Sequence, residues 1–498
     1  MNIGLAICFL LTLSSCYRDK GNYDYIHLPD IKIEAEDVVY ATQFDTLKLP
    51  VTVNWDNAYE GEYEFDWRIW SNEVGGNRHR KNIASTKNLA YVVKEIPGSY
   101  SLVFTCRNKR TGVNTYKHMT LAVQGSITEG WLVLREKDGE TDFDLIMTPF
   151  ISQRTEKDKI LYGLYESVNG EKLTGKGLKI KSYFALGRYQ YVTVLTDRGG
   201  VRLSAVTMQK TFDIATLMLD RKPLKPENYF FFDYYWCLGR GNEILISDGR
   251  YYINALLGNG FTEPILTNGE TYKASPYGPR WLWTFAGMIY DEAKGRFLGI
   301  NRNMVAHRLP EANGRLFDWN NMHGSLLYME VGFKNYDYAL IEDWNTHKKT
   351  LYVLNFDKKK DFDVAMYPAD DCPELDKALC YAIGMRGNVF FYATGKNIYL
   401  YDYAGTNTGK KVYTLASESE KITGMKILKP CVDRFIKNHP YNNKVLVFST
   451  YDEIRKEGKV YMYYFNESNG ALDISSERIF GGFGKILDME YNFAKYGS

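Results

Sequence analysis

Short segments in which apolar and polar residues alternate follow one another from about residue 31. Residues 47–53, 63–70 and 100–107 all show this alternation, and the last of them follows a turn at Pro97-Gly98. Successive side chains of a strand point to opposite faces, so a period of two predicts strands with one buried face. The pattern therefore predicts a small β-sandwich over residues 31–124.

A different pattern fills residues 125–498. A short apolar run, a polar or glycine turn and a second apolar run recur seven times, starting at residues 131, 191, 243, 296, 350, 389 and 445. A repeat of roughly 40 to 50 residues is what a four-stranded blade of a β-propeller requires. We therefore expect an all-β protein in which a β-propeller of about seven blades, over residues 125–498, follows the small β-sandwich. One or two large β-sandwiches, with similar strands but no fixed period, are the alternative.

The ends of this second region bear on whether it closes on itself. Apolar segments precede several of the repeated pairs, as at residues 283–289 and 381–384, and each would supply the innermost strand of a blade. Residues 485–491 have the same character near the end of the chain. Pairing of 485–491 with the segment at Gly130 would close the ring and remove exposed sheet edges.

The beginning of the chain is apolar up to Cys16 and polar directly after it. The run is too short for a permanent transmembrane helix, and small residues before such a cysteine are typical of a bacterial lipoprotein signal. We expect residues 1–16 to be a signal peptide that ends at a lipidated Cys16, and residues 17–30 to be a tether. No Lys or Arg precedes Cys16, so a basic start is missing, and a plain cleaved signal peptide is the alternative.

Composition narrows the class of partner. The net charge is +2 without a long basic run, which argues against nucleic acid, and an aromatic content of 15% with 40 Tyr favours strands. No other segment approaches transmembrane length, so contact with a membrane is expected only through the lipid. The cysteines after Cys16 match no zinc box and no disulfide framework, and Cys372 and Cys380 are equally compatible with a disulfide or two buried thiols.

The first region also resembles a known family. Trp67 on a central strand and the segment PGSYSLVFTCRNKRTGVNTYKHMTLAV at 97–123 resemble a PKD or immunoglobulin-like domain, in which a Pro-Gly-x-Tyr turn leads into the penultimate strand. CYRDKGNYDY at 16–25 resembles the opening of PKD-like family lipoproteins of Bacteroidetes. The resemblance implies an outer-membrane lipoprotein, periplasmic or surface-facing, beside a glycan-uptake system of the starch-utilisation type. It implies no reaction.

Motifs for catalysis or cofactor binding are absent from the sequence. The seven histidines form no metal-binding pair, and there is neither a Gly-x-Ser-x-Gly elbow nor a phosphate-binding loop, so no metal and no cofactor are expected. Adjacent acidic residues such as Glu342-Asp343 point to opposite faces of a strand and are poorly placed to share one substrate. The sequence leaves any catalytic residue unknown.

Aromatic residues in polar surroundings suggest a more specific function, the binding of a carbohydrate. Trp319 lies in LFDWNNMHG and Trp344 in IEDWNTHKK, where exposed rings would stack on sugar faces and neighbouring polar groups would bind hydroxyls. A second group lies at one loop-to-strand junction, although Trp281 and Trp283, on one face of a strand, are more typical of a core. The candidate ligand-binding residues are Trp319, Trp344, Trp281, Trp283, Tyr277 and Arg280.

These features predict a lipid-anchored cell-envelope protein that binds a glycan, or a component of a polysaccharide-uptake system, without catalysis. One alternative is a propeller-type polysaccharide hydrolase or lyase with its active site in the central channel. The other is a structural accessory that contacts outer-membrane uptake proteins. Asp, Glu, His and Arg side chains that converge in the channel would favour the enzyme. An exposed aromatic platform would favour the glycan-binding protein, and a broad apolar patch would favour the structural accessory.

Overall fold

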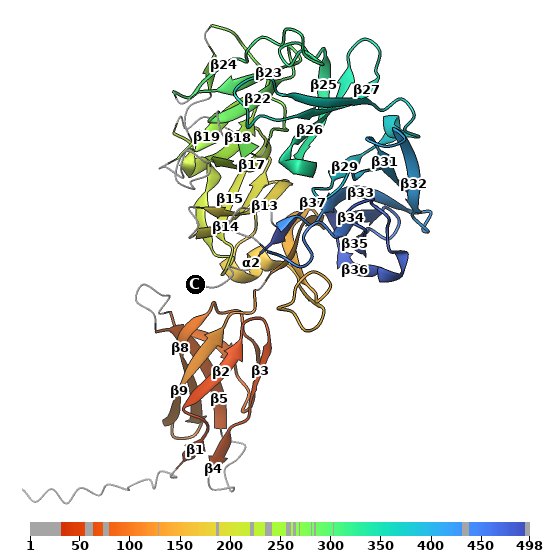
Figure 1. Cartoon of the computed structure of the whole chain (residues 1–498). Helices are drawn as coiled ribbons and strands as arrows, with labels where there is room; N and C mark the ends of the chain where they lie inside the picture. The colour runs from red at the N-terminus through yellow and green to blue at the C-terminus, as the bar shows by residue number, and fades with distance from the viewer. Residues whose placement is uncertain are drawn as a thin grey trace, which may run out of the picture. The chain divides into compact units, whose positions relative to one another are not determined.

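The structure is a computed structural model of the 498-residue chain (Figure 1). It describes residues 31–54, 63–72, 79–127, 129–185, 189–219, 224–234, 242–254, 260–261, 265–267, 269–279, 281–282, 285–301, 303–430 and 438–493. The expected signal peptide, Cys16 and the tether lie outside these residues. The described chain is all-β, and its α-helical content is the six-residue helix α2 (Leu164–Asn169). The fold class is therefore confirmed at the level of an all-β protein.

The chain divides into two compact units. The first comprises Met1–Ala41, Asp45–Val93 and Gly98–Val123, and the second comprises Thr42–Phe44, Lys94–Pro97 and Gln124–Ser498.

The first unit contains one five-stranded sheet and two strand pairs among its described residues. The sheet has the order β2-β9-β8-β5-β6, and the pairs are β1-β4 and β3-β7. The bounds are β1 (Lys32–Glu34), β2 (Val38–Thr42), β3 (Thr46–Leu49), β4 (Thr52–Asn54), β5 (Tyr63–Ser71), β6 (Lys81–Ala84), β7 (Leu89–Val92), β8 (Gly98–Asn108) and β9 (Asn114–Gln124).

The core of this unit contains Trp67, the central-strand tryptophan of the PKD-like resemblance. It is completely buried, its ring centroid lies 4.8 Å from that of Phe104, and its Nε1 donates to the carbonyl of Thr86 at 2.9 Å. The single strand expected over 47–53 is wrong, because the segment forms two strands, β3 and β4, in different pairs. Pro50 stands between them and has no N–H to continue a ladder.

The described part of the second unit contains seven four-stranded sheets. The first four sheets contain β10 (Gly130–Lys137), β11 (Glu140–Met147), β12 (Lys159–Leu161) and β37 (Lys485–Asn492); β13 (Gly177–Ala185), β14 (Tyr189–Thr196), β15 (Gly199–Ser204) and β16 (Lys210–Asp213); β17 (Pro226–Tyr234), β18 (Asn242–Ser247), β19 (Arg250–Asn254) and β21 (Trp281–Leu282); and β20 (Leu266–Thr267), β22 (Gly287–Asp291), β23 (Arg296–Ile300) and β24 (Val305–Arg308).

The other three sheets follow in chain order. They contain β25 (Gly324–Val331), β26 (Asp337–Asp343), β27 (Lys349–Leu354) and β28 (Asp363–Pro368); β29 (Cys380–Ile383), β30 (Phe390–Ala393), β31 (Asn397–Asp402) and β32 (Thr408–Thr414); and β33 (Glu420–Ile427), β34 (Val445–Asp452), β35 (Glu457–Tyr464) and β36 (Arg478–Phe483).

All seven expected hairpins occur in the structure, each in a different sheet. They are β10–β11, β14–β15, β18–β19, β23–β24, β27–β28, β30–β31 and β34–β35. Within the sheets, antiparallel pairing predominates, while β17–β21 and β20–β24 are parallel.

The middle strands are apolar on both faces because each sheet packs against two neighbours. In β10, Trp131 and Val133 belong to a cluster shared with the seventh sheet, whereas Leu132 and Leu134 belong to one shared with the second. In β34, Val447 packs with the first sheet and Phe448 with the sixth. Alternate residues of one run thus enter two different cores, which explains why the runs read as continuously apolar.

The last strand of the chain completes the first sheet. Strand β37 pairs antiparallel with β10, with Gly130 opposite Asn492 and Trp131 opposite Tyr491. The expected pairing of 485–491 with the segment at Gly130 is therefore confirmed. Figure 1 shows the sheets of this unit following one another around a common centre, with the blue β37 beside the first sheet.

Candidate functional site

A cavity of about 350 Å³ lies inside the second unit, where its innermost strands approach one another. Strands β13, β17, β25, β29, β33 and β37 all contribute residues to its wall, and they come from six different sheets. Contacts between β13 and β37, between β29 and β33, and between β33 and β37 hold these strands together. The volume lies at the lower end of the range for small-molecule sites.

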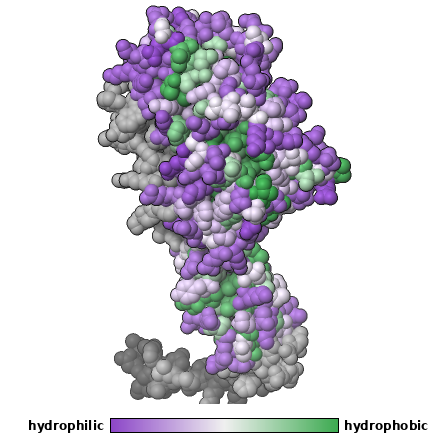
Figure 2. Space-filling view, turned by 45° about the vertical axis from the view of Figure 1, so that its right-hand side comes forward, coloured by the Kyte–Doolittle hydropathy of each residue, from purple (hydrophilic) through white to green (hydrophobic). Residues whose placement is uncertain are grey.

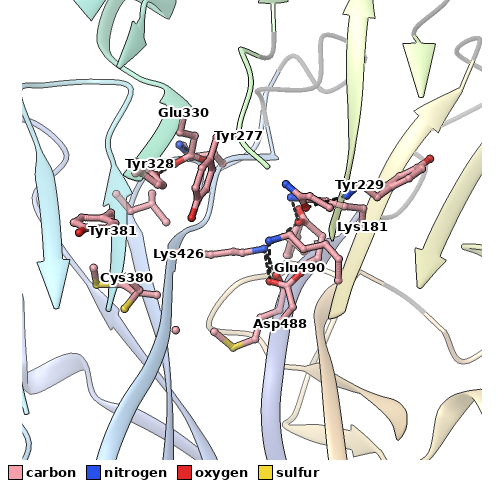
Figure 3. Close-up of a pocket in the computed structure, with 18 of the residues that line it drawn as sticks. Lys181, Tyr229, Tyr277, Tyr328, Glu330, Cys380, Tyr381, Lys426, Asp488 and Glu490 are labelled. Carbon is pink, nitrogen blue, oxygen red and sulfur yellow. Dashed lines mark hydrogen bonds and ion pairs between the residues drawn. The ribbon is translucent and has the colours of Figure 1, made fainter. Parts of the chain in front are cut away.

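One wall of the cavity carries a compact group of charges from three strands. Lys181 Nζ lies 2.5 Å from Glu490 Oε2, and Lys426 Nζ lies 3.2 Å from Asp488 Oδ1 and 3.3 Å from Glu490 Oε2. Lys179 Nζ lies 3.7 Å from Asp488 Oδ1. We call these five residues the lysine–carboxylate cluster. Figure 3 labels Lys181, Lys426, Asp488 and Glu490 of this cluster.

The acidic members of this cluster are held ionised. Burial acts to raise the pKa of Asp488, but Lys179, Lys426 and Lys181 outweigh it and lower that pKa to about 2. Burial opposes ionisation of Glu490 in the same way, and Lys181 and Lys426 lower its pKa below the usual value. Both carboxylates are therefore fixed hydrogen-bond acceptors at neutral pH.

The two lysines that approach Glu490 behave differently. Burial acts to lower the pKa of Lys426, but Asp488 and Glu490 raise it above its usual value. Burial lowers the pKa of Lys181 to about 8, because repulsion from Lys426 and Lys179 offsets much of the attraction of Glu490. Of these two lysines, Lys181 is thus the one whose charge changes closer to neutral pH.

A second ion pair lies on another part of the wall. Lys429 Nζ lies 2.7 Å from Glu330 Oε1 and donates to the backbone carbonyls of Ile383 at 3.0 Å and Val331 at 3.3 Å. The hydroxyl of Tyr328 donates to the other oxygen of Glu330. Burial and the adjacent Glu330 raise the pKa of Tyr328 well above its usual value, so Tyr328 stays a protonated donor.

Tyrosine rings form the side of the cavity around this pair. The ring centroids of Tyr277 and Tyr328 lie 6.1 Å apart at an interplanar angle of 67°, and those of Tyr328 and Tyr381 lie 5.5 Å apart. Figure 3 shows these three tyrosines and Glu330 on one side of the cavity and the labelled members of the lysine–carboxylate cluster, with Tyr229, on the other. The site therefore combines an aromatic wall with a charged wall.

Trp319 does not take part in this site. Its side chain is completely buried in the core shared by the third, fourth and fifth sheets, and its Nε1 donates to the carbonyl of Pro310 at 2.7 Å. The expectation of an exposed ring is therefore wrong. The polar neighbours that suggested exposure serve the loop itself, since Asn320 donates to the carbonyls of Leu309 and Pro310.

The other predicted residues are scattered. Trp344 is 40% exposed, and its Nε1 donates to Ser325 Oγ at 2.9 Å, but it does not line the cavity, whereas Tyr277 does. Arg280 and Trp283 lie outside the described residues, and only the backbone of Trp281 is described, in β21. The structure thus brings one member of the predicted set into the cavity.

The lysine–carboxylate cluster was missed because its members come from distant parts of the chain. A local signal exists all the same. Lys179 and Lys181 alternate with apolar residues in GLKIKSYF, and Asp488 and Glu490 do so in ILDMEY. Charged residues at every second position of an otherwise apolar inner strand indicate a face that is not packed in a core.

Other chemistry is limited within the described residues. They contain no group of three or more His, Cys, Asp or Glu placed to hold a metal ion. Cys106, Cys372 and Cys380 are free thiols, so Cys372 and Cys380 are not paired with each other. No helix in the described ranges is both long and apolar enough to cross a bilayer. Glu342 and Asp343 lie at the end of β26, away from the cavity lining.

Comparison with known sequences supports the resemblance of the N-terminal part. The sequence model of the PKD-like family matches residues 16–177. The match begins at Cys16 and runs beyond the first unit, through β10, β11, β12 and α2 to the start of β13. No curated protein sequence is significantly similar to the chain.

Comparison with solved structures concerns the fold. A crystal structure described as a quinonprotein alcohol dehydrogenase-like protein from Bacteroides thetaiotaomicron VPI-5482 is similar with a TM-score of 0.54 and 13% identity, over 94% of this chain and 100% of that one. Dihydro-heme d1 dehydrogenase NirN gives 0.41 at 9% identity over 73% and 75% of the two chains. Polysaccharide lyase Uly1 gives 0.24 at 9% identity over 78% and 85%. At 13% identity the first similarity concerns the fold alone. The TM-scores of the other two are below 0.5, and we draw no conclusion from them.

Proposed function

We propose that this protein binds a saccharide, without catalysis, in the cavity of its second unit. The observation that carries the proposal is the pairing of an aromatic wall, formed by Tyr277, Tyr328 and Tyr381, with a wall of fixed donors and acceptors. A sugar ring has apolar faces that stack on aromatic rings and hydroxyls that need hydrogen-bond partners. Side chains already held by ion pairs lose little freedom when a ligand binds.

The second unit, on this proposal, is a seven-bladed β-propeller, and the cavity is its central channel. Apolar clusters join the first and second sheets, the second and third, the third to fifth, the fifth and sixth, the sixth and seventh, and the seventh and first. The β10–β37 pairing links the two ends of the unit. The first unit would be a PKD-like β-sandwich that acts as a spacer.

The cellular setting is part of the same proposal. Lipidation of Cys16 would anchor the protein in the cell envelope, at the outer membrane, where it would serve a polysaccharide-uptake system. The apolar run before Cys16 and the PKD-like match that begins at this residue support this setting. Uptake proteins of the outer membrane are the expected protein partners.

One observation favours a second function. A lysine with a pKa of about 8, as for Lys181, is partly neutral close to neutral pH, and a neutral lysine beside a bound substrate can act as a general base. A polysaccharide lyase or hydrolase is therefore the second candidate. The accessory role has less support, because the face in Figure 2 shows narrow apolar strips among hydrophilic residues of the second unit and no broad apolar patch.

Affinity electrophoresis and calorimetry of the mature chain, residues 17–498, against a panel of polysaccharides test the proposal. Binding that falls about tenfold or more in Tyr381→Ala supports the aromatic wall as part of the site. Tyr116→Ala is the matched control, since Tyr116 is 54% exposed on β9 of the first unit. Release of reducing ends or unsaturated products in the same mixtures would establish the enzyme, and the absence of any binding would refute the proposal.

The anchor is tested separately. Cys16→Ala in cells should abolish labelling by a fatty-acid analogue and release the protein from the membrane fraction. Retention of both in the variant would contradict lipidation at Cys16.

A further inference from the structure

Charge is unbalanced in the lysine–carboxylate cluster. Three lysines, Lys179, Lys181 and Lys426, share two carboxylates, Asp488 and Glu490. The remaining charged residues that line the cavity among the described ones are Lys429 and Glu330, which balance each other. One positive charge of this wall therefore has no carboxylate of its own.

The excess charge faces the cavity. The side chains of Lys179, Lys181 and Lys426 are 24–29% exposed, whereas those of Asp488 and Glu490 are 9% and 17% exposed. A ligand in the cavity thus meets ammonium groups more than carboxylates. The carboxylates lie deeper, where they hold the three lysines in position.

We infer that the saccharide bound in the cavity carries an anionic group, a carboxylate or a sulfate ester, which pairs with Lys179, Lys181 and Lys426. The inference rests on the proposed binding function and names the class of its ligand. A ligand anion supplies the missing negative charge and makes charge-assisted hydrogen bonds to ammonium groups that the protein has already oriented. The aromatic wall opposite then accommodates the sugar ring.

The behaviour of Lys181 agrees with this assignment. Its own carboxylate partner, Glu490, is shared with Lys426, and burial together with the neighbouring lysines lowers the pKa of Lys181 to about 8. The cluster by itself therefore stabilises the charge of Lys181 incompletely. A bound anion would complete that stabilisation and raise this pKa.

Matched pairs of polysaccharides test the inference on the mature chain. Alginate, polygalacturonate and hyaluronan are each compared with their carboxyl-reduced forms, in which the uronate has become the neutral sugar, and chondroitin sulfate is compared with unsulfated chondroitin. Neutral glucans, mannans and galactans complete the panel. The expected result is binding of at least one acidic glycan and a loss of about tenfold or more in affinity when its carboxylate or sulfate is removed.

Variants place the anion in the cavity. Lys181→Met and Lys179→Met should each weaken binding of the acidic glycan about tenfold, and Lys181→Arg should retain most of it. Lys179→Met is the variant less prone to a folding defect, because it removes only the longest ion pair of the cluster, the 3.7 Å contact with Asp488. Lys348→Met removes a charge that is 65% exposed and outside the cavity lining, and it should bind like the parent protein.

Each outcome is decisive. Equal affinity for an acidic glycan and its neutral counterpart would overturn the inference and leave saccharide binding intact. Undiminished acidic binding in both Lys181→Met and Lys179→Met would overturn it as well, because the anion would then bind elsewhere. Failure of every polysaccharide to bind would refute the proposed function itself, and the inference with it.

Discussion

The hydroxyl of Tyr229 donates a hydrogen bond of 2.8 Å to the carboxylate of Glu243, which is completely buried. The same carboxylate accepts from Asn254 Nδ2 at 2.6 Å, and from Tyr183 and Arg202. Tyr183 and Arg202 belong to the second sheet and the others to the third, so this one acidic side chain joins two sheets. A buried carboxylate is tolerated only with such a full set of partners.

Glu243→Leu should destabilise the second unit strongly, since it leaves the guanidinium of Arg202 buried without its carboxylate. Breaking a buried ion pair by removing one partner costs about 3–5 kcal/mol. Differential scanning calorimetry should show a lower Tm. Glu243→Gln keeps hydrogen-bond acceptors and should lose less, and an unchanged Tm in Glu243→Leu would show that the network contributes little.

The first sheet of the second unit should be sensitive to substitution at Gly130. A Cβ at this position would lie 2.4 Å from the carbonyl oxygen of Ile146 and 3.0 Å from Leu145 Cδ1, so Gly130→Ala forces β10 away from β11. The expected loss in stability is about 1–3 kcal/mol, as for overpacking. Gly395→Ala is the control, because its nearest neighbour there would be a lysine side chain at 3.8 Å. Equal Tm values for the two variants would contradict the register of β10 and β11.

Substitution of Trp319 and of Trp344 should lower the free energy of unfolding by different amounts, because one ring is in the core and the other is at the surface. Trp319→Ala removes a completely buried ring that packs against Phe362 with centroids 5.0 Å apart, and it should cost about 3–5 kcal/mol. Trp344→Ala should cost less than about 1 kcal/mol, as is usual for an exposed position. Denaturant titration of both variants gives the comparison. A Trp319→Ala protein as stable as the parent would mean that the loop of residues 316–324 does not pack Trp319 into the core.

Binding of an acidic glycan should weaken as pH rises through about 8. Below this value Lys181 is charged and pairs with the anion, and above it the free protein loses that charge. Lys179, Lys426, Asp488 and Glu490 face Lys181. The pKa of Lys426 is raised and those of Asp488 and Glu490 are lowered, so these three groups keep their charges over this interval. Titration calorimetry between about pH 7 and about pH 9 should show affinity falling about tenfold and proton uptake on binding above pH 8. Lys181→Met should lose this pH dependence, and a parent protein with flat affinity would contradict it.

The described thiols should be unreactive in the folded protein. Burial raises the pKa of Cys106 to about 11 and the pKa values of Cys372 and Cys380 to about 12, so little thiolate is present at pH 8. Alkylation with iodoacetamide followed by peptide mass mapping should modify all three in denaturant and leave them free in buffer. Rapid native alkylation of Cys380, which lines the cavity, would show that this wall opens.

The seven hairpins could be predicted because a sheet packed on both faces leaves a continuous apolar run, as in residues 131–134 and 445–448. The strand break at Pro50 was also available from the sequence, since proline cannot donate in a ladder. The burial of Trp319 could not be predicted from the sequence. Local polarity does not show that Asn320, only 5% exposed, turns its amide inward to bind the backbone.

The cavity could not be derived from spacing. Lys181 and Glu490 approach to 2.5 Å although 309 residues separate them. Only the arrangement of the sheets brings β13 beside β37, and no local pattern encodes that contact. The alternating charges of these two strands would have marked them as lining residues once a common centre was assumed.

The pairing of Gly130 with Asn492 has a consequence for how the protein is made. The first sheet of the second unit emerges from the ribosome early, but its innermost strand is the last to be synthesised. Until then β10 keeps an open edge that can pair with other chains, and a contact of such sequence separation forms slowly. A chain with this order of synthesis benefits from a holding chaperone until β37 has been made, and truncation that removes β37 should cause aggregation.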